Sequence, residues 1–397
     1  MKYLIALIAL ALPTYLIRFD FGGIPTTLLE ILIYVIFLIG LWKLAYCQWL
    51  KVRQTFWLPI GVLLLALIIS TIIAPDKLAA AGQVRAYFID PLLVFWLMIC
   101  YLEIKDFSWI FLGLAGSGLF VSIHTIIQKI LGHVTADGRV IGIFGYSPNY
   151  VALFLAPIIV MTVACGIQMM AKKSYQLSVI SYLLSVISIV AIYFSGSRGG
   201  LIAVVGGIVF YLILRYWEII RKKMLYKTAV LLLVTAAVFG TAWFFKPDFQ
   251  ASGGRVTSSN NLRWQIWGAS FELGAKHPLL GVGLANFQPA FSDFTQDRGN
   301  FPEYITPQAL TPHNIFLMFW LTCGILGLAA FIWLLVIFYK SGFKNLTKSW
   351  VLILMAAMTT IILQGLVDTP YFKNDLSILF WMILGSVLLL NYENKLN

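Results

Sequence analysis

Long apolar runs occupy most of this chain, and they constrain its fold more than any other feature. A helix needs about 20 apolar residues to cross the hydrocarbon core of a bilayer. About twelve stretches have that character: 3–17, 24–47, 55–73, 86–104, 108–131, 148–171, 176–195, 199–219, 225–245, 313–339, 349–368 and 376–392. Hydrophobic residues make up 60% of the 397, more than in soluble domains. We therefore expect an all-α polytopic membrane protein, a single integral membrane domain over 1–397 with about 12 transmembrane helices.

The distribution of charge predicts which side of the membrane each terminus faces. With the amino terminus placed in the cytoplasm, the inner segments hold the lysine clusters near 43–51, 172–173, 222–227 and 340–348. These inner segments then carry the whole net charge of +12, as the positive-inside bias requires. We expect both termini in the cytoplasm. Because topology accounts for the basic composition, we expect no nucleic-acid partner.

Arginines concentrate on the predicted outer side, where positive and negative charges balance. They are Arg18, Arg85, Arg139, Arg198, Arg255, Arg263 and Arg298. Topology does not require arginine over lysine, but a planar guanidinium binds two phosphate or carboxylate oxygens at once. The pattern favours an anionic ligand at the outer face. The alternative for any single arginine is an interfacial anchor that snorkels to the headgroups.

A polar segment at 247–312 separates the ninth and tenth apolar runs. Asn260 predicts a helix start, and a helix through about Ala275 places Arg263 and Trp267 on one side. The segment from His277 to Gly283 must break this helix, and a second short helix is expected near 284–294. A loop of this length with its own pattern is usually functional. We expect an extracytoplasmic loop that carries part of a site.

Three arginines outside this loop are candidates for the same site. The Ser195–Gly200 turn joins two spans, and its small residues expose backbone amides that, with Arg198, can hold phosphate oxygens. A simple tight turn with an anchoring arginine is the alternative. Arg85 lies at the mouth of the fourth span, with Asp90 as a candidate partner, and Arg139 precedes the sixth span.

His313 stands where the polar segment re-enters the apolar region, directly after Pro312. An imidazole at such a boundary can act as a general base that takes a proton from a hydroxyl. A satisfied structural histidine is the alternative. The four histidines have no spacing of metal ligands, and we expect neither a metal ion nor another cofactor.

Several motifs, in this order, resemble those of the O-antigen ligase and polymerase superfamily. The motifs are Ser195–Gly200, Arg263-Trp264-Gln265-Ile266-Trp267, His277–Gly283 with Asn286-Phe287, and His313-Asn314 with Gly324 and Gly327. The resemblance is strongest over about 190–330. The apolar runs with one large outer loop extend it to the whole chain.

The resemblance implies an integral membrane glycosyltransferase of GT-C architecture in the bacterial inner membrane. It implies an inverting, metal-independent transfer of a glycan from undecaprenyl diphosphate to an acceptor hydroxyl on the outer face. The acceptor is a lipid A core sugar in ligases and another repeat unit in polymerases, and both remain open. His313 is then the catalytic base. Arg198 and Arg263, or Arg255 in place of Arg263, bind the diphosphate, with Arg85 and Arg139 as further members.

A transporter or flippase of lipid-linked oligosaccharides is the alternative from another class. Such a protein is expected to have related halves and charges along a path through the whole bilayer. The sequence has few charges inside its apolar runs, and its arginines gather on one face. The pattern therefore favours an enzyme that acts at the outer surface.

Overall fold

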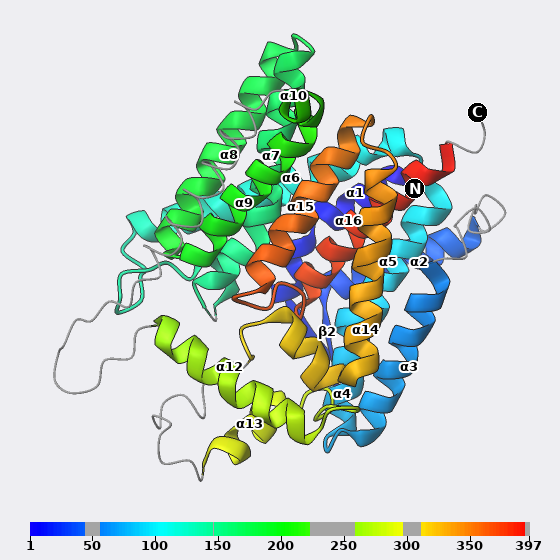
Figure 1. Ribbon diagram of the computed structural model, residues 1–397, viewed down its shortest axis with the longest axis vertical. Coiled ribbons are helices and arrows are strands. Elements are labelled where there is room, and N and C mark those ends of the chain that lie inside the picture. The colour runs from blue at the N-terminus through cyan, green and yellow to red at the C-terminus, as the bar shows by residue number, and fades with distance from the viewer. Residues whose placement is uncertain (44–55, 146, 223–258, 297–310, 394–397) are drawn as a thin grey trace.

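The computed structural model describes residues 1–43, 56–145, 147–222, 259–296 and 311–393 (Figure 1). The ninth apolar run and Arg255 therefore lie outside the described residues. Helices dominate the described part: α1 (Lys2–Leu10), α2 (Leu28–Trp42), α3 (Trp57–Ile73), α4 (Lys77–Val84), α5 (Asp90–Tyr101), α6 (Phe107–Ile130), α7 (Asn149–Ala171), α8 (Tyr175–Ser195), α9 (Arg198–Arg215), α10 (Trp217–Lys222), α12 (Ser259–Lys276), α13 (Phe287–Gln296), α14 (Ile315–Phe343), α15 (Ser349–Gly365) and α16 (Asn374–Glu393). The expectation of an all-α membrane protein is confirmed.

Six helical segments of the described part are long and apolar enough to cross a membrane, and four further apolar helices are shorter. The number of spans is not confirmed as twelve. The first expected span is only the short α1 followed by a 3-10 turn over Leu12–Leu16. The second begins at Leu28 rather than residue 24, because Ile24–Thr27 forms strand β2 and Thr27 caps α2 in a capping box with Glu30.

The segment between the third and fourth apolar runs, 74–85, is mostly helix. The Asp76 side chain accepts a hydrogen bond from Ala79 N at 2.9 Å and so caps α4. One π-helical turn at Arg85–Ile89 then joins α4 to α5, so the described helix runs on from Lys77 to Tyr101. The fourth span is therefore longer at its amino end than its apolar run indicates.

The most buried span is α7, which packs against α6, α8, α9 and α15. Hydroxyl pairs join these helices: Ser122 donates to Ser188 between α6 and α8, and Thr162 bonds Ser185 between α7 and α8. On the other side of the molecule, α14 packs on α3 and α16 packs on α5. Hydrogen bonds of this kind fix neighbouring helices where apolar packing alone is weakly directional.

One end of the helix bundle carries the β-hairpin and the two helices of the polar segment. The hairpin of β1 (Arg18–Phe21) and β2 (Ile24–Thr27) lies there with α4, α12 and α13, while the amino terminus and the end of α16 lie at the opposite end (Figure 1). The strands pair antiparallel, with Arg18 opposite Thr27. We call this the hairpin end. The two helices expected in the polar segment are confirmed as α12 and α13, the second starting at Phe287 instead of 284.

The turn between α12 and α13 is attached firmly to α3 and α14. Val282 N donates to Leu321 O at 2.7 Å, and Leu284 N donates to the Ser70 hydroxyl at 2.9 Å. Gly281 has a φ of +72°, and a Cβ there would lie 2.3 Å from the Leu321 carbonyl oxygen. The turn therefore needs glycine both for its backbone angle and for its close contact with α14.

Replacing Gly281 by alanine is expected to destabilise the protein by about 1–3 kcal/mol, because a side chain meets both a left-handed backbone and a neighbouring carbonyl. The melting temperature in detergent should fall by several degrees relative to wild type. Gly268→Ala is the matched control, since Gly268 lies in α12 with nothing within 4 Å of its added Cβ. An unchanged melting temperature for Gly281→Ala contradicts this description of the turn.

Candidate functional site

His313 lies in a strained connection at the start of α14. Its φ is +48°, a left-handed value that few non-glycine residues adopt. Asn314 directly after it caps α14 by accepting from Phe316 N and Leu317 N. The His313 carbonyl accepts from the Trp267 indole N–H at 3.1 Å, so α12 holds it from one side. Backbone strain of this kind persists only where surrounding contacts enforce it, and it clusters at functional sites.

Asp368, in the connection between α15 and α16, orients the His313 ring. Its Oδ1 lies 3.4 Å from His313 Nδ1 and also accepts from Thr369 N, while its Oδ2 accepts from the Asn149 amide at 3.2 Å. Asp368 is 7% exposed, whereas the His313 side chain is 31% exposed. A proton on Nδ1 shared with Asp368 leaves Nε2 as the acceptor, which is the tautomer that a general base needs.

The charges around Asp368 favour its ionised form. Burial by itself raises the pKa of Asp368, but the hydrogen bond from His313 and the positive charges of His313 and Arg263 together hold that pKa below its ordinary value. Burial also disfavours the charged form of Arg263 and so lowers its pKa. The negative charge of Asp368 opposes this effect, and the positive charge of Arg139 adds to it. An ionised Asp368 stabilises a proton on His313, so the pair suits the abstraction of a hydroxyl proton.

Two more of the expected arginines, Arg139 and Arg198, lie at the Ser195–Gly200 turn. The side chain of Arg139 lies against the backbone of Gly196, where an added Cβ would be 2.5 Å from its Cδ, and Arg139 Nε bonds Asp137 at 2.9 Å. Arg198 is exposed at the first position of α9. The next residue, Gly199, contacts Val367, which precedes Asp368. Arg263 thus acts electrostatically on Asp368, Arg139 acts on Arg263, and Arg198 is linked to the Asp368 segment only through the contact of Gly199 with Val367.

The glycines of the Ser195–Gly200 turn have a packing role beyond the amide exposure expected from the sequence. An added Cβ on Gly200 would lie 2.4 Å from the Ala152 Cβ, so the turn lets α9 approach α7. The Gly200 amide already donates to the Ser197 hydroxyl at 3.4 Å. Arg198 is therefore presented by a helix start that is fixed against the core.

Arg85 has a different environment from the one expected. Its guanidinium forms an ion pair with Glu30 at 3.3 Å and bonds the Pro25 carbonyl. Asp90, the partner considered from the sequence, instead accepts from the Tyr34 hydroxyl at 2.7 Å. Glu30 projects from the neighbouring α2, and its other oxygen accepts from Asn374 at 3.1 Å. These contacts tie the helical segment that carries Arg85 to strand β2 and to α2.

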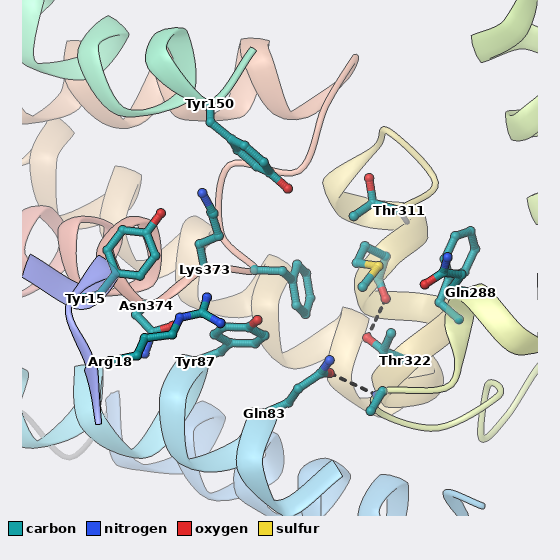
Figure 2. A pocket seen from close by; sticks show the side chains of 14 residues that line it. Tyr15, Arg18, Gln83, Tyr87, Tyr150, Gln288, Thr311, Thr322, Lys373 and Asn374 are labelled. Carbon is teal, nitrogen blue, oxygen red and sulfur yellow. Dashed lines mark hydrogen bonds between the residues drawn. The ribbon is translucent and has the colours of Figure 1, made fainter. Parts of the chain in front are cut away.

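A cavity of about 320 Å³ opens beside the His313–Asp368 pair. Tyr15, Arg18, Gln83, Tyr87, Tyr150, Ala285, Phe287, Gln288, Thr311, Met318, Thr322, Phe372, Lys373 and Asn374 line it. Lys373, Tyr15 and Arg18 project from one side of it, and Thr311, Gln288 and Thr322 stand on the other (Figure 2). Thr311 borders His313, whose N–H donates to its hydroxyl at 3.4 Å, and Tyr150 follows Asn149. The cavity therefore adjoins the segments that contact His313 and Asp368, although neither residue is among its described lining residues.

Asp368, Asn149 and Lys373 are site residues that the sequence did not single out. Asp368 pairs with a histidine 55 positions away and an asparagine 219 positions away. These separations carry no local spacing pattern. The one available signal was an aspartate and a lysine together in the short polar segment between two apolar runs, on the predicted outer side.

Comparison with known proteins finds similarity to O-antigen ligases. Residues 183–332 match the sequence profile described as O-antigen ligase. That range holds Arg198, Arg263 and His313. The chain is also 23% identical over 302 residues to the O-antigen ligase of Salmonella typhimurium strain LT2, across 71% of this chain and 69% of that protein.

Proposed function

We propose that this chain acts as a member of the O-antigen ligase family, to which it is similar, and that it transfers a glycan from undecaprenyl diphosphate to an acceptor hydroxyl. The acceptor is a lipid A core sugar or a related glycan. The observation that carries this proposal is the His313–Asp368 pair, with the buried Arg263 close enough to act electrostatically on Asp368. A base beside fixed cations suits a reaction in which a hydroxyl loses a proton while a phosphate leaving group gains charge.

His313 takes the proton of the attacking hydroxyl at Nε2, and the pair of Asp368 and His313 carries the resulting charge. The hydroxyl oxygen forms a bond to the anomeric carbon of the donor sugar as the bond from that carbon to the diphosphate oxygen breaks. Single displacement of this kind inverts the anomeric configuration. The protonated His313 returns its proton to solvent after the product leaves.

Arg263, Arg198 and Arg139 stabilise the charge that develops on the diphosphate. Guanidinium groups held by packing bind phosphate oxygens without reorganising during the reaction, which is the largest single contribution in many enzymes. The burial of Arg263 supports this role, since a partly desolvated cation interacts more strongly with an anion. The arginines thus supply the positive charge, and the proposed transfer needs no metal ion.

The proposed site faces the outside of the bacterial inner membrane, with both termini in the cytoplasm. The described lysines near residues 172–173 and 340–348 follow the carboxyl ends of α7 and α14, whereas His313 and the hairpin lie at the amino end of α14. The positive-inside bias supports a cytoplasmic position for the lysine-rich end. A polyprenyl tail then lies in the outer leaflet beside the helices.

A competition between acceptors tests this function. The purified protein in lipid nanodiscs receives undecaprenyl-diphosphate glycan together with lipid A core acceptor, and the products are separated by mass. We expect glycan on the core acceptor, with inverted anomeric configuration. Chains lengthened on the carrier instead identify a polymerase. Carrier lipid moved across a vesicle bilayer without any transfer contradicts the enzymatic proposal and identifies a flippase.

A further inference from the structure

The cavity beside His313 contains a cation in an aromatic enclosure that the proposed reaction does not use. The Lys373 ammonium lies 3.5 Å from the centre of the Tyr150 ring, 4.8 Å from that of Phe144 and 5.2 Å from that of Tyr15. Aromatic faces stabilise an ammonium without neutralising its charge. Lys373 therefore remains an attraction for an anion that enters the cavity.

The rest of the lining suits a polyhydroxylated ring better than a bare phosphate. Lys373 and Arg18 are the only cations among the described lining residues, and amides, hydroxyls and aromatic rings make up most of the remainder. Gln83 is held in place, since its Oε1 accepts from Ala285 N at 2.9 Å. Pockets of this kind combine apolar surfaces with a few positioned polar groups, over roughly 300–1,000 Å³. At about 320 Å³ the cavity suits one sugar ring.

The position of the cavity assigns it to the acceptor side of the reaction. It borders the base through Thr311 and borders Asp368 through the Asn149–Tyr150 start of α7. The proposed reaction uses three arginines for the leaving group, Arg139, Arg198 and Arg263. None of them is among the described residues that line the cavity. In an inverting displacement the hydroxyl attacks the anomeric carbon on the face opposite to the departing diphosphate, so the acceptor belongs with the base.

We propose that this cavity binds an acidic sugar of the acceptor, a ring that carries a carboxylate or a phosphate, and that the Lys373 ammonium pairs with the acid group. This assignment rests on the proposed function for its place in the reaction. The binding itself does not depend on transfer. Lys373 is a specificity residue here, because it selects the charge of the acceptor and takes no part in proton transfer.

Direct binding of small probes tests the assignment. Glucose, glucose 6-phosphate, glucuronic acid and inorganic pyrophosphate are titrated against the protein in nanodiscs of zwitterionic lipid, with saturation-transfer NMR as the readout. Wild type should bind both acidic sugars about 10–100-fold more tightly than glucose, the effect of one charge-assisted hydrogen bond. Lys373→Met should remove this preference and leave glucose binding unchanged.

Lys276→Met is the matched control, because Lys276 also lies over an aromatic ring, that of Phe294 at 4.6 Å, but outside the cavity. It should leave every probe unchanged. Equal affinities of wild type for glucose and the acidic sugars overturn the proposal. The proposal is also overturned if Lys373→Met weakens the binding of pyrophosphate but not that of the acidic sugars, since Lys373 then binds the donor diphosphate. Repeating the titrations with His313→Asn keeps the result independent of whether transfer occurs.

A pH series on unmutated protein covers the case in which Lys373→Met fails to fold. Burial lowers the pKa of Lys373 to about 8, partly offset by Asp375 and reinforced by Arg18. The preference for acidic sugars should therefore be full at pH 7 and decline as pH rises through about 8. Lys373→Arg should keep the preference at all these pH values, because guanidinium does not titrate there. Lys373 is also faced by Asp375, Arg18, Tyr15 and Tyr150. If the preference for acidic sugars still declines with pH in Lys373→Arg, one of these other groups causes the decline, and the role of Lys373 is overturned.

Discussion

His313→Asn lowers the rate of glycan transfer by about 10²–10⁴-fold, the usual contribution of a general base. Asparagine tolerates the left-handed backbone at this position, where φ is +48°, but cannot accept a proton as imidazole does. The protein should therefore fold and bind donor normally while transfer stops. Initial rates with saturating donor and acceptor, beside melting temperatures, measure both properties.

His277→Ala is the control for this substitution. His277 is also on the polar segment, but it is exposed and makes backbone bonds within its own turn. Its transfer rate should match wild type. The transfer rate of Asp368→Asn should lie between those of His313→Asn and wild type, and its pH profile should be shifted. The reason is that Asp368 acts by fixing the tautomer of His313. A His313→Asn variant with wild-type rate removes the base assignment.

Arg263→Gln is expected to reduce the rate by about 10²–10³-fold, as loss of a preorganised donor does in other enzymes. The guanidinium stabilises the leaving diphosphate, so the loss should appear in kcat more than in the KM for donor. Arg198→Gln should also lower kcat more than it raises the KM for donor. Steady-state kinetics at varied donor concentration separates the two parameters.

Arg85→Gln provides the contrast. It removes an ion pair with Glu30 that ties the hairpin to α2, so we expect a lower melting temperature with a nearly unchanged kcat. The reverse pattern, in which Arg85→Gln stops transfer and Arg263→Gln leaves it intact, contradicts the arrangement of the site proposed here.

The helices were predictable because apolar runs and end signals are local. Asn260 and the break at His277-Pro278 gave α12 within one residue at each end, and the apolar runs matched α6 through α9 closely. The errors have local causes too. The capping box of Thr27 makes α2 begin after the start of the second apolar run, and the Asp76 cap makes a helix begin before the start of the fourth. Hydropathy alone predicts neither cap.

The site was only partly predictable, for a different reason. The arginines and His313 stood out by residue type, but their partners depend on contacts between distant segments. Glu30 from α2 pairs with Arg85, and Asp368 orients His313. A single sequence contains no spacing rule for either pair. Tertiary packing therefore gave Arg85 the partner Glu30 instead of Asp90, and it brought Asp368 to His313.

The central claim is that His313, Asp368 and the surrounding arginines form one site for glycan transfer. The most direct test is single-turnover transfer by the purified protein from undecaprenyl-diphosphate glycan, in wild type and in His313→Asn loaded with the same donor. We predict product on the acceptor in wild type, and an intact bound donor with about 10²–10⁴-fold slower transfer in the variant. Equal single-turnover rates in the two proteins contradict the account.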